Sequence, residues 1–117
     1  MNKICTDILQ SKKLVELGID VNTADIIYNI FGESYIRHGV DIDNTHSPAW
    51  SLSALLRLIP TDDKKDEYYV DTESHSDYHT VSYRNCWDGC IHSEYSTESL
   101  IDAAFEMVCW LLENKKI

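Results

Sequence analysis

Hydrophobic positions recur with two different spacings along the chain. In three segments apolar residues return every three or four positions, with polar residues between them, which is the spacing of one face of an α-helix. The predicted helices begin at Thr6, at Ser47 or Ser51, and at Ser96 or Thr97, residues whose side chains can cap a helix. Gly18 is expected to end the first helix as a glycine C-cap. Pro60 is expected to end the second, because the residue before a proline is disfavoured in the helical region.

Between these helices lie short segments rich in β-branched and aromatic residues, separated by turn-forming residues, a pattern typical of strands. The predicted strands cover 26–31, 35–40, 68–72, 78–84 and 91–95. A helix over 23–31 is the competing interpretation, because Ala24, Ile27 and Phe31 also fit one helix face. Strands in adjacent pairs with short connections favour antiparallel pairing.

The predicted order of elements is α-β-β-α-β-β-(β)-α. It predicts an α+β fold of two layers, in which one antiparallel sheet of four to five strands packs against about three helices. A length of 117 residues suits one ordinary domain, so residues 1–117 are expected to form a single domain. A chain of this size can bury a full core, so we expect no disulfide and no structural cofactor to be required.

The composition is strongly acidic, since 20 Asp and Glu against 10 Lys and Arg give a formal net charge of −10. Such a surface repels nucleic-acid backbones and anionic membranes, so direct binding to either is not expected. The acidity is typical of a soluble protein. It also fits a partner that is a basic protein, or a decoy that occupies the nucleic-acid-binding surface of another protein.

The chain has no pattern of a signal peptide, and no apolar run approaches the roughly 18 residues of a membrane helix. These features predict a cytoplasmic protein. Its four cysteines, Cys5, Cys86, Cys90 and Cys109, are then expected to be free thiols.

Cysteine and histidine residues gather in the C-terminal half and form the candidate metal site. Two thiols, Cys86 and Cys90, flank an Asp-Gly turn, and His79 and His92 lie on the adjoining predicted strands. Two thiolates and two imidazoles suit tetrahedral zinc. Zinc knuckles usually have two residues between their cysteines, however, whereas three separate this pair. The alternative is a hairpin whose cysteines pack as small apolar residues and whose histidines point to water.

The same residues could instead support cysteine chemistry. Cys86 or Cys90 would act as the nucleophile with His79 or His92 as its base. Cys5 precedes a predicted helix, where a thiol can become more acidic. No local sequence signature accompanies any of these residues, and the chain has no phosphate-binding glycine loop, nucleophile elbow or HExxH motif.

Aromatic residues concentrate on the predicted C-terminal strands and are the candidate binding residues. The set comprises Tyr69, Tyr83, Trp87 and Tyr95. Side chains alternate between the two faces of a strand, so some of these rings are expected to face solvent, where Tyr and Trp favour protein contacts. Trp87, at the tip of a predicted hairpin, is the strongest candidate. The alternative is that most of the rings cover the core beneath the helices.

Three blocks of the chain carry a resemblance to a known group of proteins. They are Cys-Thr-Asp-Ile at 5–8 with Ser-Lys-Lys-Leu at 11–14 and Glu-Leu-Gly-Ile at 16–19; Pro-Ala-Trp-Ser-Leu-Ser-Ala-Leu-Leu at 48–56; and Ile-Asp-Ala-Ala at 101–104 with Glu-Met-Val-Cys-Trp-Leu-Leu at 106–112. They resemble small proteins of Bacteroides-like gut bacteria and of their phages and mobile elements, a group with no established activity. The resemblance implies a bacterial or phage cytoplasm and no particular reaction.

Together these features favour a non-catalytic module that binds another protein. The first alternative is a small metal- or cysteine-dependent enzyme built on Cys86, Cys90 and the neighbouring histidines. The second is an acidic decoy of a nucleic-acid-binding protein.

Overall fold

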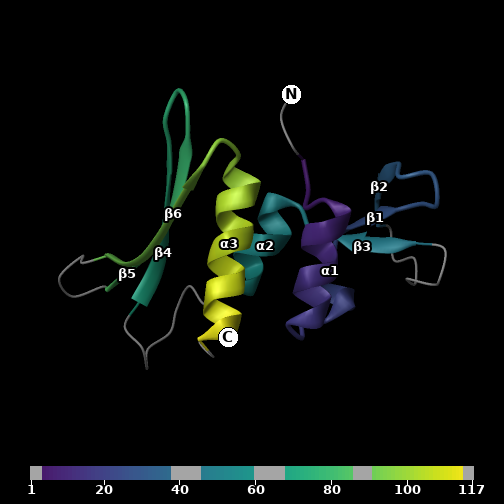
Figure 1. Cartoon of the computed structure of the whole chain (residues 1–117), viewed down its shortest axis with the longest axis horizontal. Helices are drawn as coiled ribbons and strands as arrows, with labels where there is room; N and C mark the ends of the chain where they lie inside the picture. Colours follow the sequence, from purple (N-terminus) through teal and green to yellow (C-terminus); the bar gives the residue numbers. More distant parts are fainter. Residues whose placement is uncertain (1–3, 38–45, 60–67, 86–90, 115–117) are drawn as a thin grey trace.

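The structure is a computed structural model, and it describes residues 4–37, 46–59, 68–85 and 91–114. Its architecture is α+β, with three α-helices and two separate three-stranded antiparallel sheets (Figure 1). The elements are α1 (Ile8–Glu16), the 3-10 helix η1 (Val21–Thr23), β1 (Ile26–Tyr28), β2 (Ser34–Ile36), β3 (Ser47–Ala49), α2 (Leu52–Leu58), β4 (Tyr68–Ser74), β5 (His79–Asn85), β6 (Ile91–Thr97) and α3 (Leu100–Glu113).

Helix α1 is closed by capping interactions at both ends. Its N-cap is Asp7 and not the predicted Thr6: the Asp7 side chain accepts from the Gln10 amide, and the Gln10 side chain accepts from the Asp7 amide. This reciprocal arrangement is a capping box. Gly18 follows the helix end as predicted, with a φ of +101° that favours glycine. The amides of Gly18 and Ile19 donate back to carbonyls of the last turn, which completes a Schellman motif.

The N-terminal sheet has the strand order β2-β1-β3. The predicted hairpin between the first two strands is confirmed, with shorter strands than expected, and the alternative helix over 23–31 is not formed. Ser47–Ala49, one possible start of the second helix, instead forms β3 and pairs with β1. The helix starts at the other predicted position, because Ser51 is the N-cap of α2 and accepts from the Ala54 amide.

The C-terminal sheet has the order β4-β5-β6, and each of its strands has seven residues. The central strand, β5, alternates between two environments. Val81 and Tyr83 are buried with the core residues of α3, whereas Thr80 and Ser82 belong to the opposite face, where small polar residues are enclosed between the flanking strands.

Helix α3 supplies much of the core. Its N-cap is Ser99, so Ser96 and Thr97, the predicted caps, lie in β6. The apolar spacing of its sequence predicts a core face of six residues, of which Leu112 is partly buried and the other five are buried: Ile101, Ala104, Phe105, Val108 and Leu111. Trp50 and Leu14 also belong to this cluster, which therefore links α3 to both α1 and β3.

The prediction of one sheet with four to five strands was wrong, because six strands form two sheets. Strand β3 continues through Trp50 and Ser51 directly into α2, and α2 packs on α3, so helices stand between the two sheets (Figure 1). The molecule is therefore elongated, with principal extents of 47 × 34 × 22 Å. Within the described ranges, no helix has the length and apolarity to span a membrane.

Candidate functional site

A buried polar cluster ties the N-terminal sheet to the helices. Thr6 is fully buried, and its Oγ1 accepts from the Trp50 amide at 3.1 Å and lies 2.8 Å from the Ser11 hydroxyl. The Thr6 amide donates in turn to the Trp50 carbonyl at 2.9 Å. The Trp50 indole donates to Thr23 Oγ1, also at 2.9 Å, just before β1 begins. These bonds fix the position of the sheet relative to α1 and α2.

Asp25 also links the N-terminal sheet to the helices, through hydrogen bonds with Ser51. Its Oδ1 accepts from the Ser51 amide at 2.9 Å, and its other carboxylate oxygen accepts from the Ser51 hydroxyl. Because Ser51 is also the N-cap of α2, the carboxylate orients the start of that helix. We assign this pair a role in positioning the elements.

The turn between β1 and β2 is built on Asn29. Its amide donates to the Glu33 carbonyl, its carbonyl accepts from the Gly32 amide, and both distances are 3.0 Å. Its side-chain oxygen accepts from the amides of Phe31 at 2.9 Å and Glu33 at 3.0 Å. Gly32 has a φ of +79°. Ile30, Phe31 and Gly32 thus form a three-residue hairpin loop with glycine in the left-handed position.

Large apolar side chains are exposed on this hairpin, and we term the set the hairpin surface. It comprises Ile30 at 72% exposure, Phe31 at 80%, Tyr35 at 51% and Ile36 at 65%. Turn positions normally hold Gly, Asn, Asp, Pro or Ser, so large apolar residues such as Ile30 and Phe31 are unusual there. With most of their surface in solvent, they contribute little to the core. Large exposed apolar residues that the fold does not require, such as Ile30 and Phe31 at the loop, are typical of an interaction site.

The predicted aromatic residues lie in different environments. Tyr83 is fully buried, with its ring centroid 6.0 Å from that of Trp110, so it belongs to the core and not to a contact surface. Tyr95 is partly buried against the same core. Tyr69 lies in β4, but its side chain, like the whole of Trp87, falls outside the described residues. Tyr83 therefore follows the alternative interpretation, in which the aromatic rings cover the core beneath the helices.

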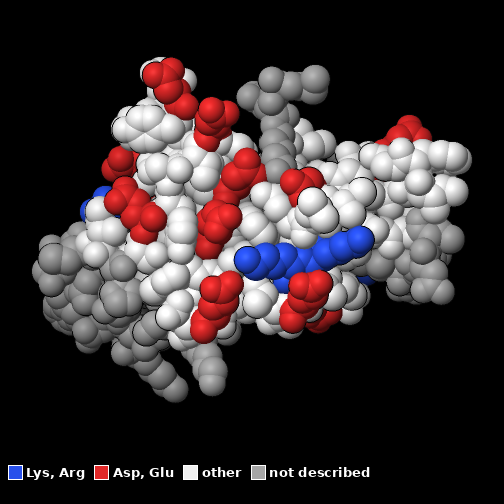
Figure 2. Space-filling view, viewed as in Figure 1, with Lys and Arg blue, Asp and Glu red and all other residues white. Residues whose placement is uncertain are grey.

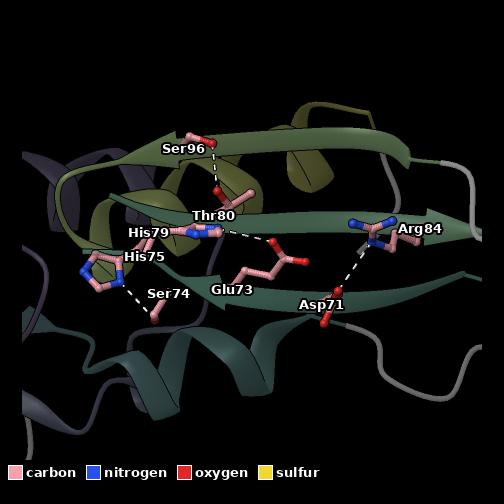
Figure 3. A network of polar contacts seen from close by, with 8 residues as sticks. All are labelled: Asp71, Glu73, Ser74, His75, His79, Thr80, Arg84 and Ser96. Atoms are coloured by element: carbon pink, nitrogen blue, oxygen red, sulfur yellow. Dashed lines mark hydrogen bonds and ion pairs between the residues drawn. The ribbon is translucent and has the colours of Figure 1, made fainter. Parts of the chain in front are cut away.

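Of the predicted Cys/His set, Cys86 and Cys90 fall outside the described residues, as does the side chain of His92. His79 Nδ1 lies 3.0 Å from the Ser74 hydroxyl (Figure 3). In the part of the chain that the structure describes, no three Cys, His, Asp or Glu side chains are grouped to hold a metal ion. The geometry of the predicted zinc site is therefore untested.

The two described thiols are buried. Cys5 is 3.3 Å from the Tyr28 hydroxyl, which donates to the Thr6 carbonyl at 3.0 Å. Burial, followed by the contact with Cys5, raises the pKa of Tyr28. Burial also raises the pKa of the Cys109 thiol to about 11. Cys109 is therefore protonated at neutral pH and unsuited to act as a nucleophile.

A groove of about 880 Å³ lies where α2 and α3 begin beside β5. Its lining includes His79, Ser51, Ser99 and Asp102. Both serines are helix N-caps, and Asp102 Oδ1 accepts from the Gln10 side chain at 2.8 Å. The two serines therefore stabilise helix ends, and Asp102 stabilises the contact between α1 and α3. They do not form the hydrogen-bonded nucleophile and base that acyl or phosphoryl chemistry would use.

Charge is distributed unevenly over the molecule. The described part of β4–β6 and α3, with its connections, contains eight acidic residues and one basic residue, Arg84. The acidic residues are Asp71, Glu73, Asp77, Glu94, Glu98, Asp102, Glu106 and Glu113. Acidic side chains spread over α3 and the β4–β5 hairpin, whereas basic ones form a band over α1 (Figure 2). On the sheet Arg84 Nε lies 3.5 Å from Asp71, and His75 lies 3.4 Å from Glu73 (Figure 3).

No protein family, curated protein or solved structure matches this chain. The sequence pattern predicts a strand over 26–31, which places Ile30 and Phe31 at a strand end and so does not reveal the hairpin surface. A signal was present in the pattern: Gly32 follows two large apolar residues directly, which fits a hairpin loop ending in glycine.

Proposed function

We propose that this chain is a non-catalytic protein-binding module of a bacterial or phage cytoplasm, and that it binds its partner through the hairpin surface. The observation that carries the proposal is the exposure of Phe31 and Ile30 at the tip of an ordered turn. The partner is expected to present an apolar patch, because burying a Phe or Ile side chain contributes about 1.5–3 kcal/mol. Neither nucleic acid nor membrane is expected to bind directly, given the net charge of −10.

Three features support a module that presents a rigid contact surface. The Asn29 side chain orders the loop, the Thr6–Trp50 bonds hold the sheet, and Asp25 fixes the start of the next helix. A preorganised surface loses little conformational entropy on binding, which favours affinity.

The test is affinity capture from host lysate with the wild type, the double variant Ile30→Ser/Phe31→Ser, and Tyr78→Ser. Tyr78 is the matched control, because it is a half-exposed aromatic residue on the β4–β5 hairpin. We expect a stoichiometric partner that survives moderate salt, binds Tyr78→Ser equally, and is lost with the double variant. A partner retained by the double variant, or none with the wild type, would count against the proposal.

The second candidate is an acidic decoy of a nucleic-acid-binding protein. It is favoured by the excess of acidic over basic residues in β4–β6 and α3. Binding of this kind is electrostatic, so capture should weaken steeply between low and moderate salt. It should also be insensitive to Ile30→Ser/Phe31→Ser, which separates the two candidates in one experiment.

A further inference from the structure

A second apolar surface lies on α1, away from the hairpin loop. A shallow groove of about 320 Å³ runs beside this helix and is lined by Ile8, Val15, Val21 and Pro48. Ile8 and Val15 remain 39% and 41% exposed. They are seven positions apart, so they lie on one face of the helix, with Ser11 and Lys12 between them in the groove lining. The described residues leave the Ile8 and Val15 side chains partly exposed.

Two opposite charges border the groove. Lys12 and Glu16 both line it and are four residues apart on α1. Within the described ranges neither forms an ion pair, whereas the neighbouring Lys13 lies 3.9 Å from Glu113. A partner that matches this border must carry an acidic group opposite Lys12 and a basic group opposite Glu16. An antiparallel copy of α1 has both groups in that order.

The distribution of charge points to the same partner. Residues 1–59 contain seven acidic and five basic residues, so this part of the molecule is close to neutral. The described part of β4–β6 and α3 is strongly acidic, as noted above. Two copies would meet the least repulsion if they joined through the neutral part and kept their acidic parts apart.

We propose that the α1 groove is a self-association surface, in which a second copy of this chain packs its α1 antiparallel to the first about a twofold axis. Ile8 of each copy then lies toward Val21 of the other, and Lys12 of each faces Glu16 of the other. An isologous contact of this kind repeats every pair twice. It is separate from the hairpin surface, so a dimer would display two hairpin surfaces.

The test is sedimentation velocity of the purified full chain over a wide concentration range, with Lys12→Glu, Glu16→Lys and the double exchange Lys12→Glu/Glu16→Lys. The measured mass of the wild type should rise with concentration from 13.5 kDa to twice that value. Each single variant places like charges together twice and should weaken association by about tenfold. The double exchange restores opposite pairs and should recover it. An equimolar mixture of the two single variants should form a mixed dimer.

Lys13→Glu is the matched control, because it makes the same charge change on α1 outside the groove lining. It should leave association unchanged, as should Ile30→Ser/Phe31→Ser. Thermal unfolding of every variant separates loss of association from loss of folding. A wild type that remains monomeric at all concentrations overturns the proposal, and so does a dimer that Lys12→Glu does not weaken or that the double exchange fails to restore.

Discussion

Replacing Thr6 with valine tests most sharply how the N-terminal sheet is held to the helices. Valine keeps the shape of threonine but removes the hydroxyl that accepts from the Trp50 amide at 3.1 Å and contacts Ser11 at 2.8 Å. The Trp50 amide would then be buried without its acceptor. Leaving a buried polar group without its partner costs about 1–3 kcal/mol, and the Ser11 hydroxyl loses its contact with Thr6 at the same time.

Thr6→Ser is the comparison variant, because it keeps the hydroxyl and loses one methyl group. A lost buried methyl group costs about 1 kcal/mol, so the serine variant should be the more stable of the two. For a domain of this size, 1 kcal/mol corresponds to about 4 °C in Tm. We therefore expect Tm to fall by about 8 °C for Thr6→Val and by about 4 °C for Thr6→Ser, if each cost lies near the middle of its range.

Denaturant and thermal unfolding followed by circular dichroism measure both variants, and amide hydrogen exchange reports directly on Trp50. Its amide should lose protection in Thr6→Val and keep it in Thr6→Ser. A valine variant as stable as the serine variant, with Trp50 still protected, would refute the role assigned to the Thr6 hydroxyl.

The other predictions concern the hairpin, the core, the pH dependence of stability and metal content. Phe31→Ser should lower the free energy of unfolding by no more than about 0.6 kcal/mol, because a side chain that is 80% exposed contributes only a fifth of the free energy of full burial. Tyr83→Ala should lower the free energy of unfolding by about 3–5 kcal/mol. Gly32→Ala, at a φ of +79°, should cost about 1–2 kcal/mol in urea unfolding without altering the core. The ordinary pKa of the Cys109 thiol is 9.0 and the folded value is about 11, so the unfolded chain loses this proton first and stability should fall as pH rises through that interval. Unfolding midpoints from pH 8 to 11 should therefore decline less steeply in Cys109→Ala. Protein purified without chelator should contain substoichiometric zinc by elemental analysis and keep its Tm in EDTA; one equivalent of zinc with a lower Tm in EDTA would support the metal-site alternative.

Local features of the fold were predictable because neighbouring residues decide them. Gly18 ends α1 through a backbone conformation that favours glycine, and Ser51 caps α2 with its own hydroxyl. The apolar spacing of α3 identified the buried face of that helix. In each case the determining atoms lie within one or two helical turns of each other in the sequence.

The division into two sheets was not predictable in the same way. Strand pairing depends on contacts between distant segments, and the sequence contains no local mark that β3 pairs with β1 and leads straight into α2. The N-caps of α1 and α3 differ from the predicted residues for a related reason. Thr6 bonds to Trp50, 44 residues away, and Thr97 extends β6, so tertiary contacts outweighed their capping preference.

The candidate site was harder to predict, because exposure is a property of the folded chain. Tyr83 and Phe31 are both large aromatic residues in or beside strands, yet one is fully buried and the other is 80% exposed. The difference follows from the position of α3 over the C-terminal sheet and from the position of Phe31 in a loop.

The most direct test of the proposed function is site-specific photocrosslinking in living cells. A photoreactive p-benzoylphenylalanine would replace Phe31 in one chain and Tyr78 in another, so that each probe stands on an exposed hairpin. Binding through the hairpin surface predicts one discrete adduct of higher mass from position 31 and none from position 78. Absence of an adduct at position 31, or equal adducts at both positions, would contradict it.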